Sequence, residues 1–387
     1  MRHVIFRSLF VCAAMRFTDE VLIAILMKMR RPGGCKLTPQ EWKTLAGTEV
    51  TDKKEADGTL ADLKGTEMWF QASYSWSVVA MAQVIRSVHS ARLAKVPLYI
   101  WQAEDHLTNR PFNVSLRDAS LYVLHHANMN DTGRLPGLGM VHVGMAVRIT
   151  TTQEASIVPV DFTGVVVDVV LNENDRHSAS EHFRSASEHT SSLIRLQNLP
   201  EAIIVKLDKC DTDLLPLSAC ALHEATGASS ACAACYPLRG HYAVKPRMSE
   251  AFTVDITVPK EVGGVKTWVT VNLKAKRRQL AMTILNASTL HTLQGATCEP
   301  GLIFHWCFPR RLSMEMRWLA VYVALSRVPS LKQLRSIGLT AKTATPIRQI
   351  IEQGPPTGIV NRFAQLFEAK IQETMSAAVA AMEELGW

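Results

Sequence analysis

The sequence predicts a mixed α/β fold that is interrupted by a small β-domain and closed by a C-terminal helix. An apolar helical pattern at 78–95 ends before Pro97 and leads into a short buried strand at 98–101, as in α/β layering. Between 141 and 171, β-branched runs follow one another without helices. The α/β pattern returns after Arg278, so the β-rich stretch is interpreted as an insertion.

Two helices are expected near the N-terminus. Thr18 can cap a segment in which apolar residues recur at helical spacing from Val21 to Met29. Pro32 and the two glycines after it end this helix. Residues 38–41 read Thr-Pro-Gln-Glu, which is a capping box with proline at the first helical position and predicts a second helix.

The insertion is expected to consist of short strands and turns. Gly263 and Gly264 precede a lysine and a threonine, which resembles the end of a phosphate loop. Valine stands where that motif requires its second glycine, so the pair is interpreted as a hairpin turn. Strands are predicted at 141–150, 164–171, 202–207 and 268–273.

Charge is concentrated in the C-terminal third. The 387 residues carry a net charge of +7, and 47% hydrophobic with 20% charged residues is a globular composition, which excludes a disordered, collagenous or coiled-coil chain. Residues 274–327 contain eight basic and two acidic residues, a net +6. This excess fits a polyanionic partner or a solvated basic face. Its densest part, 274–278, fits a nuclear-import patch, a phosphate contact or a basic strand edge.

Cysteine content and hydropathy favour an intracellular protein, nuclear or mitochondrial rather than secreted. Eight cysteines are too few for a disulfide scaffold of this length. No run of about 18 uncharged apolar residues is present, so we expect no membrane partner. Residues 1–15 faintly resemble a targeting segment, although Arg7 interrupts the apolar run and an ordinary buried element fits as well.

A group of cysteines and one histidine has the spacing of a zinc knuckle. Two pairs, each separated by two residues, can form a tetrahedral site, since thiolate and imidazole are ligands that Zn²⁺ prefers. Reduced surface cysteines are the alternative interpretation. The four candidate ligands are Cys220, His223, Cys232 and Cys235.

Two further stretches carry the main functional signal. Residues 289–297 read T-x-H-x-x-Q-G-x-T, which predicts a short polar helix that Thr289 can cap and that glycine ends. A buried strand follows at 301–304. Residues 322–328 read Y-V-A-L-S-R-V and end an apolar helix with one arginine, Arg327.

These two stretches together resemble motifs V and VI of superfamily 1B DNA helicases of the Pif-one and RecD type. The segment around Arg16 resembles motif IV, and the β-rich stretch resembles the small barrel inserted in the second RecA-like domain of that family. The similarity covers about residues 10–335. Two positions depart from the family pattern, with Thr292 in place of a lysine and Ala281 in place of a proline.

The resemblance implies a second RecA-like helicase domain with an inserted small β-barrel and a C-terminal helix. Residues 1–132 and 276–342 would form the RecA-like domain, 133–275 the barrel with its long loops, and 343–387 the helical extension. The family's first RecA-like domain, with its phosphate loop and magnesium-binding acidic pair, has no counterpart in these residues, which contain no G-x-x-x-x-G-K-[ST]. The chain therefore resembles the C-terminal half of such a helicase.

By the same resemblance, Arg327 and Arg16 match arginines that stabilise charge on the γ-phosphoryl group of ATP. The implied cofactors are ATP and Mg²⁺, and the implied partners are single-stranded or forked DNA and a separate first RecA-like domain. Such helicases act in DNA repair and recombination. The motif V positions, which link the nucleotide cleft to the single strand, are Thr289, His291, Gln294, Gly295 and Thr297.

Three functional hypotheses follow from these observations. The first is a helicase half that hydrolyses no ATP by itself, because it lacks a phosphate loop. The second is a non-enzymatic single-stranded nucleic-acid-binding module, stabilised by a zinc site, that has the helicase fold but no ATP-driven motor activity. The third is a protein-interaction scaffold, which would bind no nucleic acid even at low salt.

Overall fold

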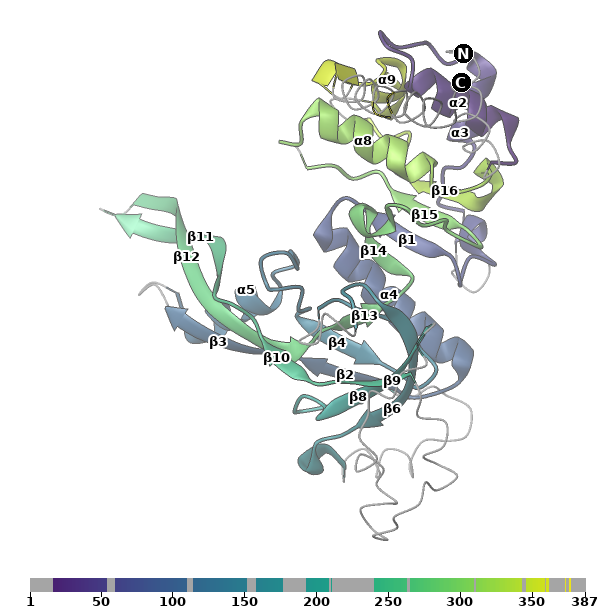
Figure 1. Cartoon of the computed structure of the whole chain (residues 1–387). Coiled ribbons are helices and arrows are strands. Elements are labelled where there is room, and N and C mark those ends of the chain that lie inside the picture. Colours follow the sequence, from purple (N-terminus) through teal and green to yellow (C-terminus); the bar gives the residue numbers. More distant parts are fainter. Residues whose placement is uncertain are drawn as a thin grey trace. The chain divides into compact units, whose positions relative to one another are not determined.

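The computed structural model divides the chain into two units, which are described separately (Figure 1). Unit one comprises residues 1–75 and 289–387, and unit two comprises residues 76–288. The structure describes residues 17–53, 60–109, 114–151, 158–176, 193–208, 210, 240–262, 265–309, 311–342, 346–358, 360–361, 373 and 376.

Both predicted N-terminal helices are present in unit one. Helix α2 (Glu20–Met29) is capped by Asp19, whose carboxylate accepts hydrogen bonds from two backbone amides of the first turn. The prediction that Thr18 is the cap was wrong, because the carboxylate one residue later reaches those amides. Helix α3 (Pro39–Ala46) has the predicted capping box, with Thr38 and Glu41 each bonding the other's backbone.

A parallel sheet lies at the centre of unit one. Strand β1 (Phe70–Ser73) pairs in parallel with β15 (Leu302–His305), and β15 pairs in parallel with β16 (Leu334–Ile337). Strand β14 (Ala287–Thr289) lies on the other side of β1. One apolar core joins β1, β15 and β16 to α2, α3, α8 (Met314–Leu325) and α9 (Ile347–Glu352). The predicted α/β class, with a parallel sheet and flanking helices, is confirmed.

Unit two begins with the predicted helix and strand. Helix α4 (Trp76–Ala94) is followed by β2 (Leu98–Gln102), in agreement with the boundary expected at Pro97. Strand β2 is central to a three-stranded sheet, antiparallel to β4 (Leu138–Val141) and parallel to β7 (Leu193–Arg195). Its Trp101 is 2% exposed and packs on Gly139, where a Cβ atom would lie 2.1 Å from the indole ring.

The β-rich stretch forms a five-stranded antiparallel sheet in the order β13-β5-β6-β8-β9. Alternate residues of these strands share one buried core with β2 and α4. The strands predicted at 164–171 and 202–207 are confirmed, whereas the one predicted at 141–150 is divided by a turn, so that β4 ends at 141 and β5 occupies 146–149. Closure into a barrel stays a prediction. The bounds are β5 (Ala146–Ile149), β6 (Thr163–Val170), β8 (Ala202–Leu207), β9 (His241–Val244) and β13 (Met282–Ile284).

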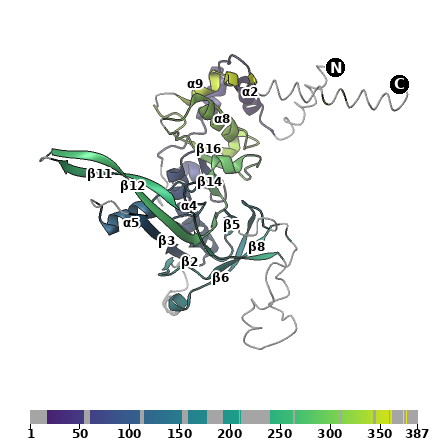
Figure 2. The same ribbon diagram turned by 60° about the vertical axis from the view of Figure 1, so that its left-hand side comes forward.

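A long β-hairpin is the third component of unit two. Strand β11 (Phe252–Val262) pairs along its whole length with residues 265–275 of β12 (Val265–Leu280), and Val262 lies opposite Val265. That register confirms the predicted hairpin, while residues 263 and 264 themselves lie outside the described residues. Beside β12 lie β3 (Glu104–Asn109) and β10 (Pro246–Met248), and helix α5 (Leu116–Leu124) packs on the hairpin's apolar face. In Figures 1 and 2 the hairpin tip extends beyond β3.

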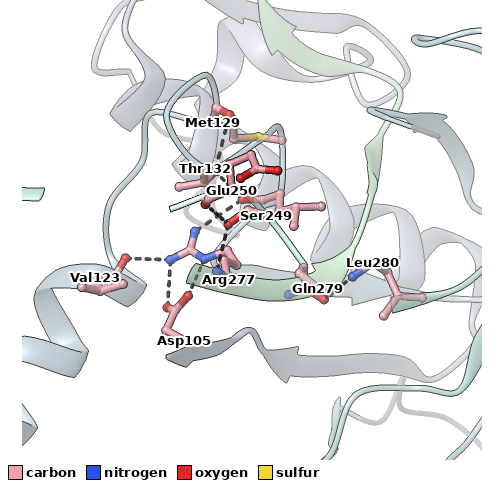
Figure 3. Close-up of polar contacts among 10 residues, drawn as sticks. Asp105, Val123, Met129, Thr132, Ser249, Glu250, Arg277, Gln279 and Leu280 are labelled. Carbon is pink, nitrogen blue, oxygen red and sulfur yellow. Dashed lines mark hydrogen bonds and ion pairs between the residues drawn. The ribbon is translucent and has the colours of Figure 1, made fainter. Parts of the chain in front are cut away.

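A buried arginine joins the hairpin to its neighbours (Figure 3). Arg277 is 0% exposed and makes a bidentate ion pair with Asp105, with N–O distances of 2.8 and 2.9 Å. Its guanidinium also donates to the carbonyl oxygens of Val123 and Leu135. Its backbone amide donates to the Ser249 hydroxyl. One side chain therefore ties together β12, β3, α5 and the loop before β4.

Two further predictions concern the chain as a whole. Among the described residues, no helix combines the length and the apolar character that crossing a bilayer requires. Most of the expected C-terminal helix lies outside the described residues, and α9 lies before it, within the range 343–387 predicted for the helical extension. The domain bounds given by the resemblance stay predictions.

Candidate nucleic-acid interface

The predicted motif V residues lie where β14 ends and the chain turns towards β15. Thr289 is the last residue of β14, and residues Leu290–Leu293 form a single turn of 3₁₀-helix, η3. The predicted cap at Thr289 was wrong, because its hydroxyl bonds the Thr292 hydroxyl at 2.9 Å instead of a backbone amide. Gly295 then has φ of +88°, a left-handed conformation that favours glycine and sets the bend.

Arg327 fastens this bend to the end of α8. Its Nη1 donates to the carbonyl oxygens of Ala296 at 2.9 Å and Leu293 at 3.4 Å. Its Nε donates to Val323 O and its Nη2 to the Ser326 hydroxyl. In return, the Cys298 amide donates to the Arg327 carbonyl oxygen at 2.8 Å. Arg327 as a whole is 9% exposed, so these bonds form largely out of water.

Three rings gather at the carboxyl ends of β1 and β15. Tyr74 follows β1, Phe308 lies three residues past the end of β15, and His291 lies on η3. The Tyr74 ring centroid is 5.2 Å from that of His291 and 6.1 Å from that of Phe308, both in edge-to-face geometry. We call these three residues the edge cluster. In open parallel sheets, ligands bind outside the carboxyl ends of the strands.

The edge cluster is exposed on the His291 side. His291 and Gln294 are exposed, Thr297 is half-buried, and Tyr74 and Phe308 are half-buried against the core of unit one. Five predicted positions therefore fall on one continuous segment, with two aromatic rings beside it. Sequence reasoning missed Tyr74 and Phe308. The signal that points to them is an aromatic residue just beyond the end of a buried strand.

The segments that follow the two predicted arginines also meet. The Thr18 amide donates to the Pro329 carbonyl oxygen at 3.0 Å. Asp19 bridges the same two segments, because its carboxylate accepts from Ser330 Oγ and from the Leu331 amide, each at 3.0 Å. Burial opposes ionisation of Asp19, but the hydrogen bonds from Leu331, from the first turn of α2 and from Ser330 outweigh it and lower its pKa.

Some predicted site residues lie outside the described part of the chain. These are Arg16 and the four candidate zinc ligands Cys220, His223, Cys232 and Cys235. Among the residues that are described, no group of three or more histidine, cysteine or acidic side chains is arranged to hold a metal ion. The zinc site and the role of Arg16 stay predictions.

No protein-family model and no curated protein matches this chain. Among solved structures, it is similar to Bacteroides Pif1 bound to ssDNA, at 12% identity and a TM-score of 0.42 over 92% of this chain and 55% of that chain.

Two more of the similar structures are also Pif1 helicases. For the Candida albicans Pif1 helicase, identity is 13% and the TM-score 0.41, over 90% of this chain and 58% of that chain. For the Bacteroides Pif1 helicase in complex with ADP-AlF3 and ssDNA, identity is 13% and the TM-score 0.41, over 92% and 55%. The chain thus spans little more than half the length of each.

Proposed function

We propose that this chain is the second motor half of a Pif-one-like DNA helicase and binds single-stranded DNA at the edge cluster. In this proposal, unit one is a RecA-like domain. The observation that carries it is the exposed His291, packed against Tyr74 at the carboxyl edge of a parallel sheet. Rings in this position offer stacking surfaces to unpaired bases, which every base can use because each has a π-face.

The contacts of Arg327 support the proposal in a second way. The guanidinium binds carbonyl oxygens at 293 and 296, so it fixes the bend that follows His291. A binding segment that is held in one conformation loses less entropy when a ligand arrives. Arg327 is thus a positioning residue in this state of the protein.

ATP and Mg²⁺ enter the proposal through the sequence resemblance alone. Hydrolysis would require a phosphate loop, which these 387 residues do not contain and which a first RecA-like domain would supply. This chain would contribute Arg327 and Arg16 to the γ-phosphate. For Arg327 that role requires its guanidinium to exchange carbonyl oxygens for phosphate oxygens.

A non-enzymatic single-strand-binding module is the second candidate function. The specific observation that favours it is that all three nitrogens of the Arg327 guanidinium already have protein acceptors. If the arginine serves only to hold the bend, the chain binds nucleic acid in the same way with or without nucleotide.

Single-strand binding and its loss on substitution of His291 test the proposed function. We expect labelled oligothymidine to bind the full chain at low salt, and His291→Ala to weaken binding at least about 5-fold, because stacking on a ring contributes about 1–3 kcal/mol per base. Fluorescence anisotropy across a salt series measures both the affinity and its salt dependence.

A matched control separates this effect from the loss of any histidine. His125 is also exposed but lies in unit two, so His125→Ala should bind like the unmodified chain. Equal affinities for the His291→Ala chain and the unmodified chain would contradict the edge cluster as the binding site. Absence of binding at low salt would contradict both candidate functions and favour a protein-interaction scaffold.

A further inference from the structure

The hairpin of unit two has one buried and one solvent-facing side. Along β12, Leu273, Ala275 and Arg277 are buried, while Lys274 and Lys276 between them are exposed. The pairing partners on β11 alternate in phase, so both strands present polar residues on the same side. We call this side the outer face. Its members are Thr253, Asp255, Thr257, Trp268, Thr270, Asn272, Lys274, Lys276 and Arg278.

Cations occupy the base of the outer face. Lys274 and Lys276 are two residues apart on one strand, so their attachment points are about 6.8 Å apart, comparable to successive phosphates of an extended nucleic-acid strand. Neither lysine has an ion-pair partner within the described part of the chain. Arg278 pairs with Glu104 at 2.7 Å, with both side chains more than 40% exposed, and such a pair is readily exchanged for a phosphate.

An aromatic ring occupies the opposite end. Trp268 is 72% exposed and lies opposite Pro259, towards the hairpin tip, which Figures 1 and 2 both show extending beyond β3. A single exposed aromatic residue is common on protein surfaces. Here it lies on the same face as the two lysines, about 20 Å from Lys274 along the strand, so one extended strand of a few nucleotides can reach both.

Uncharged polar residues lie between the two ends, with one acid among them. Thr270 faces Thr257, and Asn272 donates its amide to Asp255 across the strands. The Asp255 carboxylate repels phosphate, so it confines a sugar–phosphate backbone to the lysine end. The hydroxyl and amide groups remain for the edges of bases.

From this arrangement we infer that the outer face binds single-stranded nucleic acid, with phosphates at Lys274 and Lys276 and an unpaired base stacked on Trp268. The inference rests on the proposed function for its class of ligand but assigns a second contact, in unit two. A duplex keeps its bases stacked on one another, so it cannot offer one to Trp268.

Substitutions at both ends of the face test the inference by anisotropy with oligothymidine. Trp268→Ala should weaken binding at least about 5-fold, and Trp268→Phe by less, because a ring remains. Lys274→Ala combined with Lys276→Ala should reduce the slope of log affinity against log salt by about 1.4, or about 0.7 for each lost phosphate contact. Asp255→Asn should tighten binding, since it removes a repelling charge.

Matched variants make the outcome decisive. Lys206→Ala with Lys245→Ala removes two exposed lysines elsewhere in unit two and should leave the salt slope unchanged. An equal loss of slope in this control, an unchanged affinity for Trp268→Ala, or tighter binding of a duplex of the same length would each overturn the inference.

The two proposals fail in different ways. If the outer-face variants bind oligothymidine like the unmodified chain, while His291→Ala weakens binding, the proposed function stands and the inference is wrong. If His291→Ala leaves the affinity unchanged and the outer-face variants weaken binding, the outer face is a binding surface and the edge cluster is not. Thermal unfolding of each variant should match the unmodified chain, because all the substituted side chains are exposed.

Discussion

Arg327 directs its guanidinium into the protein rather than towards solvent. The acceptors at 293, 296 and 323 are carbonyl oxygens of two different elements, η3 with its bend and the last turn of α8. A planar fork of donors suits several acceptors at fixed angles, which the single ammonium of lysine cannot match. The predicted phosphate role and the observed positioning role therefore compete for the same nitrogens.

His142 is the residue from which we expect a pH dependence of stability. It is 1% exposed, its Nδ1 faces the Val143 carbonyl oxygen at 2.8 Å, and its Nε2 faces the Ser90 hydroxyl at 2.8 Å. The carbonyl requires a donor, so Nδ1 carries the proton and Nε2 accepts. Burial lowers the pKa of His142, and the bond to Val143 only partly opposes this.

The direction of the effect follows from proton linkage. Below the ordinary pKa of 6.5, the unfolded chain takes up a proton at His142 that the folded chain resists, so the free energy of unfolding falls with falling pH. Above that pKa the contribution is constant. Urea unfolding at pH 7.5 and 5.5 should show a smaller loss for His142→Asn, which cannot titrate. An equal loss in the variant and the unmodified chain would contradict this account.

At the scale of elements, the hairpin is held by a buried ion pair. Arg277 and Asp105 are 0% and 6% exposed at their side chains, so breaking the pair leaves an uncompensated charge away from water. We expect Arg277→Ala to lower the free energy of unfolding by about 3–5 kcal/mol. Urea unfolding followed by circular dichroism measures the change.

The next residue along the strand provides the control for that prediction. Arg278 pairs with Glu104 at a similar distance but in water, so Arg278→Ala should cost within about 1 kcal/mol. The double variant Arg277→Met with Asp105→Leu should recover much of the loss, because it removes both charges together. If the single and double variants were equally unstable, lost packing rather than the unpaired charge would be the cause.

Elements that end on local signals were predictable from the sequence. Three such signals are the capping box at 38–41, the proline after α4 and the glycine pair between β11 and β12. Each signal depends only on residues close to it in the sequence, so it can be recognised without knowledge of the fold. The turn at 289–293 was less predictable, since hydrogen bonding in the sheet draws Thr289 into a strand and shortens the expected helix to one 3₁₀ turn. Sheet pairing of this kind is decided by distant residues.

At the scale of the whole molecule, the absence of a phosphate loop from the sequence leads to a prediction about ATP. The purified chain should release no phosphate from ATP above background, with or without single-stranded DNA, because the sequence contains no phosphate loop to bind the β- and γ-phosphates. A phosphate-release assay on DNA-saturated protein measures this. Robust turnover would overturn the assignment as a half-motor.

The same preparation separates the two candidate functions. If a non-hydrolysable ATP analogue changes the affinity for oligothymidine, Arg327 or its surroundings respond to nucleotide, and the helicase-half proposal is favoured. If the affinity is unchanged, the chain behaves as a binding module.

The candidate site could be predicted only in part. The bend at Gly295 and the arginine Arg327 were indicated by the motifs at 289–297 and 322–328, because each motif is a pattern of residues close together in the sequence. The edge cluster could not be predicted, since Tyr74 and Phe308 meet only when β1 pairs with β15 across the whole insertion. The outer face required the register of the hairpin, which separates Arg277 in the core from its exposed neighbours.

The split of unit one around unit two has a consequence for biosynthesis. Strand β1 leaves the ribosome long before its partner, because Phe70 pairs with Leu302. At about 5–20 residues per second, roughly 10–50 s separate the two, during which β1 has no β15 to pair with its edge. Unit two is one uninterrupted segment of the sequence, so it can fold before β15 is synthesised. Assistance by a chaperone at this stage would protect the nascent chain from aggregation.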